Sequence, residues 1–135
     1  MGRNAFRAVL AIGGMLLVAA PVEAHHSFAA AFDENKPVSV TGVVTEVRIE
    51  NPHSWFYLDV TDASGKVTRW GFEGNTPTSL IRAGYKRDSV KVGARVTIKG
   101  SHARDPSANM GAAREIILED GRSFIVGPKG AADAY

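Results

Sequence analysis

The stretch "VSVTGVVTEVRIENPHSWFYLDV" (Val38–Val60) contains two runs of β-forming residues separated by a turn. In the first run, Val40 marks one face of a strand by the period of two that strands impose. Val43 and Val47 share that face only if one extra residue interrupts the alternation between Val40 and Val43. We expect this interruption at Thr41–Gly42, since glycine accommodates a β-bulge. A long first strand that bends at a glycine is typical of a small, strongly curved barrel.

The second run, "WFYLDV", follows the turn residues "NPHS" and is a strand by composition. Its alternation predicts two faces. One face carries Phe56, Leu58 and Val60, and the other carries Trp55, Tyr57 and Asp59.

The remaining elements are predicted from the spacing of hydrophobic residues and from the glycines, prolines and capping residues between them. A tight connection leads to a third strand over 67–74. A helix of about two turns is expected over 76–84, capped by Thr76, with Pro77 at its first position and Gly84 at its exit. Alternation returns over 88–101, a loop over 102–111 follows, and a final strand lies within 112–126. This order predicts an all-β, five-stranded OB-like barrel with one short helix between strands 3 and 4. Another small barrel or a sandwich is the alternative.

The first 24 residues have the three parts of a secretory signal peptide. Arg3 and Arg7 precede an uncharged apolar run, and Ala24 ends a stretch of small residues suited to cleavage. A membrane anchor is the alternative, but the run is shorter than the roughly 20 residues that span a bilayer. We expect a signal peptide over 1–24, an N-terminal arm over 25–36, a β domain over 37–127 and a flexible tail over 128–135. The product would be periplasmic or secreted, with no membrane span.

Composition excludes several classes of function. The chain has no cysteine, which removes disulfides, thiolate metal sites and catalytic thiols. Its formal net charge is +2, and removal of residues 1–24 leaves 14 basic and 13 acidic residues, or +1. This charge gives no reason to expect a nucleic-acid partner. About 110 residues remain, enough for one core.

Five segments together resemble a family of small exported bacterial proteins known as a domain of unknown function, family 6152. They are "AHHSF", "FDENKPVSVTGVV", "NPHSWFYLDV", "GKVTRWGFEG" and "RDSVKVGARVTIKG", in this order. The resemblance covers nearly the whole chain after the signal peptide. It implies export and one compact β domain, and it carries no activity, ligand or catalytic residue.

The histidines predict a metal site. Cleavage after Ala24 would leave His25 with a free amine beside its imidazole, a pair that chelates Cu(II), and His26 offers a second chelate. In OB barrels the loops between strands 1 and 2 and between strands 4 and 5 flank one face. His53 falls in the first loop, and His102 and Met110 fall in the second. Copper is therefore the candidate cofactor, although each histidine has an ordinary alternative role in a turn or in solvent.

The aromatic residues predict a different ligand site. Trp55 and Tyr57 face away from the expected core, and OB proteins bind sugars or single strands on such surfaces. Basic residues that could join them are Arg82, Lys86, Arg87, Lys91, Arg95, Lys99 and Arg104, opposed only by Asp88. The alternative is that the rings pack under the arm or helix and the basic residues are simply solvated.

Catalysis has little support, because no nucleophile elbow and no paired acid and base are evident. We therefore expect a non-enzymatic binding or accessory module of the bacterial envelope. It would bind either copper through histidines, or an envelope glycan, anionic polymer or protein partner through an aromatic and basic face.

Overall fold

The computed structural model describes residues 30–128. The expected signal peptide, His25 and His26 lie outside this range. The elements of the described chain are β1 (Phe32–Arg48), β2 (Trp55–Thr61), β3 (Val67–Glu73), α2 (Pro77–Arg82), β4 (Arg95–Ala103), β5 (Met110–Leu118) and β6 (Ser123–Ile125). Within residues 30–128, no helix is long and apolar enough to cross a membrane.

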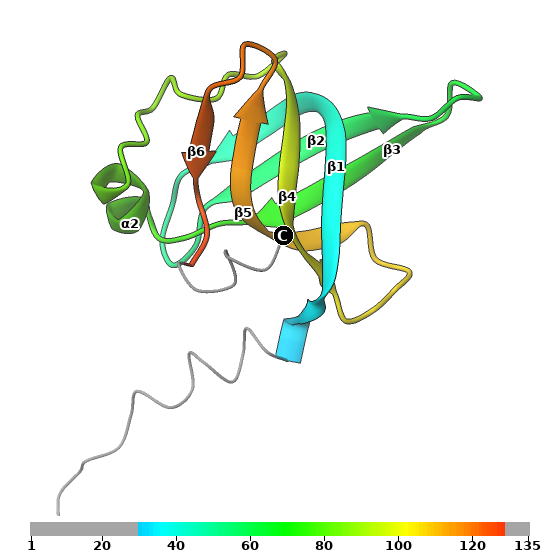
Figure 1. Cartoon of the computed structure of the whole chain (residues 1–135), viewed down its shortest axis with the longest axis horizontal. Coiled ribbons are helices and arrows are strands. Elements are labelled where there is room, and N and C mark those ends of the chain that lie inside the picture. The colour runs from blue at the N-terminus through cyan, green and yellow to red at the C-terminus, as the bar shows by residue number, and fades with distance from the viewer. Residues whose placement is uncertain (1–29, 129–135) are drawn as a thin grey trace, which may run out of the picture.

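Five strands close into a ring (Figure 1). Strand β1 pairs antiparallel with both β2 and β4, β2 pairs with β3, and β4 pairs with β5. The ring closes through a parallel pairing of β3 with β5, in which Gly71, Phe72 and Glu73 oppose residues 110–112. With a short helix between β3 and β4, this is the expected OB-like barrel. A short sixth strand, β6, adds to β5.

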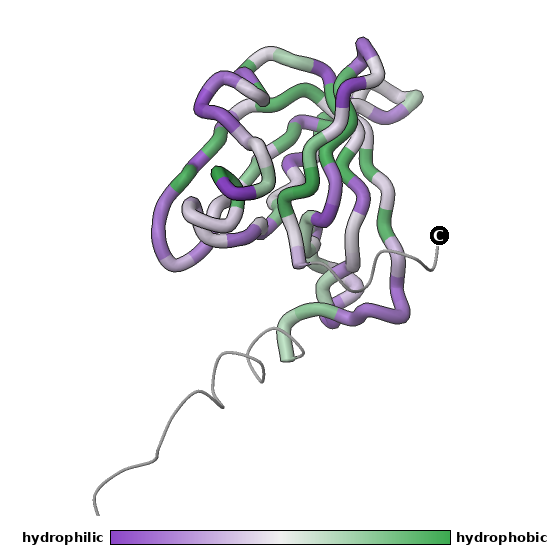
Figure 2. Tube along the Cα trace, turned by 60° about the vertical axis from the view of Figure 1, so that its left-hand side comes forward, coloured by the Kyte–Doolittle hydropathy of each residue, from purple (hydrophilic) through white to green (hydrophobic). Residues whose placement is uncertain are grey.

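The barrel interior is filled by alternate strand residues, as the period of two requires. Phe56 and Leu58 of β2 are fully buried, which confirms the inner face predicted for that strand. Phe72 and Ile98 meet them from β3 and β4, and Leu80 of α2 joins the same cluster. Figure 2 shows hydrophobic and hydrophilic positions alternating along the strands. Burial of this apolar surface is the main source of stability for so small a domain.

The bulge in β1 lies at Thr45, not at Thr41–Gly42 as expected. The register with β2 shifts between Val44 and Glu46. Val40, Gly42 and Val44 therefore all face the interior, and Val44 is only 1% exposed. Val43 faces outward. Gly42 is needed for a different reason: a Cβ there would lie 2.6 Å from the carbonyl oxygen of Asp59. Glycine at this position permits close approach of β2 and does not mark the bulge.

The bounds of β1, β4 and β5 also differ from the expectation. Residues 88–94 form turns, and β4 begins only at Arg95 and continues to Ala103. Strand β5 already begins at Met110, so the loop between β4 and β5 spans only 104–109. At the other end, residues 32–36, expected as part of an arm, belong to β1. His102 and Met110 are therefore strand residues.

The short helix is as predicted. Thr76 is the N-cap and its hydroxyl accepts a hydrogen bond from the Ser79 N–H, while Pro77 occupies the first turn. Gly84 follows the helix with a φ of +90°. Opposite α2, the β2–β3 hairpin projects from the barrel (Figure 1). Its tip, residues 61–67, is exposed throughout.

Candidate ligand-binding face

Trp55 and Tyr57 lie side by side on the outer face of β2. Their rings are nearly parallel, with an interplanar angle of 15° and centroids 6.0 Å apart. Both side chains are half-buried, while Phe56 between them is fully buried. The predicted outward orientation of the two rings is therefore confirmed.

Gly71 of β3 makes room for this pair. It lies opposite Tyr57 in the β2–β3 register. A Cβ at this position would lie 3.2 Å from Tyr57 Cε1 and 3.9 Å from Trp55 Cζ3. Because glycine has no Cβ, both rings can lean across β3 close to its backbone.

Two arginines hold the Tyr57 ring from neighbouring strands. The Arg69 guanidinium carbon lies 4.7 Å from the ring centroid, and that of Arg48 lies 5.3 Å away. Both are cation–π distances. Thr45, at the bulge, donates from its hydroxyl to the Tyr57 carbonyl at 3.3 Å.

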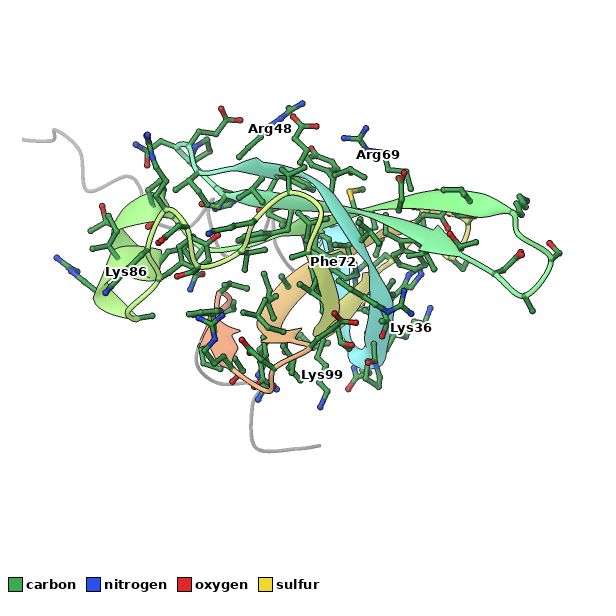
Figure 3. All side chains as sticks on the ribbon, turned by 90° about the horizontal axis from the view of Figure 1, so that it is seen from above. Lys36, Arg48, Arg69, Phe72, Lys86 and Lys99 are labelled. Atoms are coloured by element: carbon green, nitrogen blue, oxygen red, sulfur yellow. The ribbon has the colours of Figure 1, made fainter. Side chains whose placement is uncertain are left out.

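One carboxylate fixes both arginines. Arg48 Nε donates to Glu46 Oε1 at 2.5 Å, and Arg69 Nη2 donates to Glu46 Oε2 at 2.6 Å. The hydrogen bond from Arg48, followed by that from Arg69, lowers the pKa of Glu46 below its ordinary value. Figure 3 shows Arg48 and Arg69 on one side of the barrel, with Phe72 inside it.

Met110 belongs to the same surface. It pairs with Gly71 across the parallel β3–β5 seam and is 36% exposed. Since paired residues project to the same side of a sheet, Met110 lies on the outer face in the row of Tyr57 and Gly71. We call this surface the aromatic face and define it by Glu46, Arg48, Trp55, Tyr57, Arg69, Gly71 and Met110.

His53 lies at the edge of the aromatic face. Its Nδ1 contacts a carboxylate oxygen of Glu73, which is the register partner of Trp55. The loop is held there by backbone bonds: Ser54 N–H donates to the Asn75 carbonyl, and Gly74 N–H donates to the Ser54 carbonyl. His53 is thus positioned by the end of β3.

His102 has other partners. Its Nδ1 lies 2.8 Å from the carbonyl oxygen of Ala103, and its ring meets Trp70 edge-on with centroids 5.6 Å apart. Because a carbonyl oxygen only accepts, this hydrogen bond uses Nδ1 as the donor and leaves Nε2 outside it.

The structure does not bring the described metal candidates together. Figure 1 places the loop over 49–54 and the loop over 104–109 on opposite sides of the barrel. Among residues 30–128, no three histidine, cysteine, aspartate or glutamate side chains form a group suited to a metal ion. Met110 lies beside Gly71, whereas His53 contacts Glu73 and His102 contacts Trp70. The metal hypothesis therefore depends on His25 and His26.

Two of the predicted basic residues, Lys86 and Lys99, lie away from the aromatic face. In Figure 3, Lys99 lies on the side of the molecule away from Arg48 and Arg69, and Lys86 lies beside α2. Nor is Asp88 their only opposing group, because Arg95 Nε lies 3.9 Å from Glu119 Oε1.

The basic groups of the aromatic face are instead Arg48 and Arg69, which the sequence reasoning missed. Arg69 could have been found, because it alternates with the inward Trp70 and Phe72 of β3. Arg48 could not, because its orientation depends on the bulge at Thr45.

These features define an OB-like β-barrel with an aromatic face on strands β1, β2, β3 and β5. The chain belongs to the family of unknown function DUF6152, whose family model matches residues 14–112. No curated protein matches the chain.

One solved structure is similar, that of the N-terminal domain of PriB protein from Thermoanaerobacter tencongensis, described as dimeric. The two are 20% identical, the match covers 62% of this chain and 96% of that chain, and the TM-score is 0.39.

Proposed function

We propose that this protein is an exported, non-enzymatic binding module of the bacterial envelope, and that the aromatic face is its ligand-binding surface. The observation that carries the proposal is the Trp55–Tyr57 pair, laid over Gly71 and flanked by arginines. Aromatic rings supply large contact area at little cost in conformational entropy, and arginine adds directional donors. In OB folds the face formed by strands 2 and 3 is a recurrent ligand surface.

Export of the protein is supported by the n-region, apolar run and small residues of the first 24 positions. Mass spectrometry of the protein recovered from the host envelope tests it. A mature chain that begins at His25 is expected, and a chain retaining residues 1–24 would contradict the proposal.

Trp55→Ala tests the binding surface. The variant removes the larger ring of the pair from a half-buried outer position, so the barrel should still fold. We expect its retention on immobilised envelope fractions to fall by about tenfold relative to the unmodified protein. Ile81→Ala is the matched control, because Ile81 is 68% exposed and lies on α2, which contributes no residue to the aromatic face. Equal retention of the unmodified protein and Trp55→Ala on every fraction would overturn the proposal.

Copper binding is a second candidate function, and one observation bears on it. Arg104 N–H donates to the carbonyl of Ala31 at 2.9 Å, so the described chain begins beside the end of β4 that carries His102. Residues 25 and 26 precede this point by only a few positions. The mature amine with His25 and His26 could therefore share a copper ion with His102 Nε2, a nitrogen-rich set that suits copper.

Calorimetric titration of the mature protein with Cu(II) tests this candidate. His102→Gln should weaken binding by about tenfold, and His53→Gln should leave it unchanged. Binding no tighter than that of a scrambled peptide with two adjacent histidines would end the copper hypothesis without affecting the aromatic face.

A further inference from the structure

We propose that the ligand of the aromatic face is an uncharged polysaccharide segment, with one sugar ring stacked on Trp55. This inference rests on the proposed function and narrows the class of ligand. Four observations carry it: the charge balance of the face, the positions of Lys86 and Lys99, the arrangement of the rings, and the polar groups that flank them.

The aromatic face and its edge carry no excess of positive charge. Arg48 and Arg69 both pair with Glu46, and at the edge of the face Glu73 contacts His53, so two arginines stand beside two carboxylates. Both arginines are already bonded to Glu46. A polyanion is bound chiefly by neutralising its repeated charges with several unpaired cations, and this surface offers no such array. A ligand without formal charge avoids that requirement.

Two of the other basic residues lie away from the aromatic face. Lys99 lies on the side of the barrel away from Arg48 and Arg69, and Lys86 lies beside α2 (Figure 3). Such distant charges are largely screened at physiological salt, where the Debye length is about 8 Å. Lys86 and Lys99 therefore add little to the charge that a ligand meets at the aromatic face.

The rings divide into a supporting and a contacting member. Both cation–π contacts fall on Tyr57, whose ring is held by Arg48 and Arg69. Trp55, beside it, is the larger half-buried ring and lies nearly parallel to Tyr57. The negative face of an aromatic ring attracts the weakly positive C–H groups of a sugar. We infer that Trp55 is the stacking platform and that Tyr57 is mainly its support.

The flanking polar groups suit hydroxyl recognition. A guanidinium has five N–H donors, and each arginine uses one in a hydrogen bond to Glu46. Carboxylates accept from hydroxyls, and Glu46 and Glu73 stand on either side of the rings in the β1–β2–β3 register. An apolar platform with a few fixed polar groups beside it is the usual composition of small-ligand sites.

The test is a titration of the mature protein with two sets of probes, followed by tryptophan fluorescence and calorimetry. The uncharged set is a soluble β-glucan and N-acetylglucosamine oligomers, and the charged set is heparin and polyphosphate. We expect binding to at least one uncharged probe, unchanged between low and high salt and weakened about tenfold by Trp55→Ala. Ile81→Ala should bind as the unmodified protein does.

The outcomes separate this inference from the proposed function. Binding to charged probes only, lost at high salt and weakened by Trp55→Ala, would overturn the uncharged ligand and leave the aromatic face as the binding surface. Retention on protein fractions only, again dependent on Trp55, would do the same in favour of a protein partner. Binding that is indifferent to Trp55→Ala in every case would overturn both.

Discussion

At the scale of single residues, Glu46 determines the geometry of the aromatic face. It is the common acceptor for Arg48 and Arg69, and both guanidinium groups lie against the Tyr57 ring. Exposed ion pairs usually contribute little stability, but a carboxylate shared by two arginines fixes two long side chains together. Its protonation state should therefore affect the position of both arginines.

Glu46→Gln should lower the thermal unfolding midpoint at neutral pH and have no effect in acid. The arginines lower the pKa of Glu46 in the folded protein below the ordinary 4.5. A lowered folded pKa gives stability that is complete above the unfolded value and is lost as pH falls through the folded value. Unfolding midpoints of both proteins measured from neutral to acidic pH should thus converge below about pH 4.5.

Glu119→Gln is the control for this comparison, because Glu119 is 72% exposed and lies 3.9 Å from Arg95. It should change the midpoint little at any pH. A difference between Glu46→Gln and the unmodified protein that persists in acid would show that charge is not the cause.

The orientation of individual side chains could be predicted only where a short strand has an unbroken period. Trp55 and Tyr57 face outward as expected, because β2 alternates without interruption. Met110 was expected in a loop, since only the pairing with Gly71 shows that β5 has already begun. That pairing joins residues distant in sequence, and no local pattern reveals it.

At the scale of elements, β1 shapes the barrel. It has 17 residues and pairs with β4 along its first part and with β2 along its second. The two pairings overlap at Val43, where β1 passes from one neighbour to the other. Gly42 lies just before this point, against the Asp59 carbonyl of β2.

Gly42→Ala should destabilise the protein by about 1–3 kcal/mol, the usual cost of overpacking. The new Cβ would lie 2.6 Å from a backbone oxygen of β2, which cannot move as a flexible side chain can. Chemical denaturation with fluorescence detection measures the change. Ser39→Ala, at an exposed position of the same strand, should cost far less. Equal stability of the two variants would show that β2 moves away at little cost.

Element boundaries were predictable where a capping residue marks them. Thr76, Pro77 and Gly84 delimit α2 correctly, because each has a specific backbone role. Residues 88–94 alternate as a strand would, yet they form turns. Backbone bonds from Val44 to Ala94 and from Gly93 to Val44 tie this segment to β1 instead. In residues 88–94, hydrogen bonds to a distant strand therefore determine the backbone conformation, and the local alternation of hydrophobic residues does not.

At the scale of the whole molecule, the order of elements was sufficient to predict the closed barrel. It does not predict how many residues pair between each two neighbouring strands. The β1–β4 pairing involves nine residue pairs, whereas β3 and β5 share only three. Fewer paired residues mean that local opening breaks fewer bonds and exposes less surface. The parallel seam should be the weakest junction of the ring.

Hydrogen–deuterium exchange tests this difference in the intact protein. The Gly71 amide proton, which donates across the seam to the Asn109 carbonyl, should exchange faster than those of residues 96–98, which lie on β4 between β1 and β5. Uniform protection around the ring would show that the barrel opens only as a unit.

The projecting β2–β3 hairpin makes the molecule easy to immobilise. Its tip is held by Asp62 Oδ1, which accepts from the Ser64 and Lys66 N–H groups, and Gly65 takes a φ of +84° in open space. A cysteine or short peptide tag grafted between Ala63 and Ser64 would anchor the protein to a sensor surface by an exposed handle. The ring would stay intact, and Trp55 would remain accessible to analytes passed over the chip.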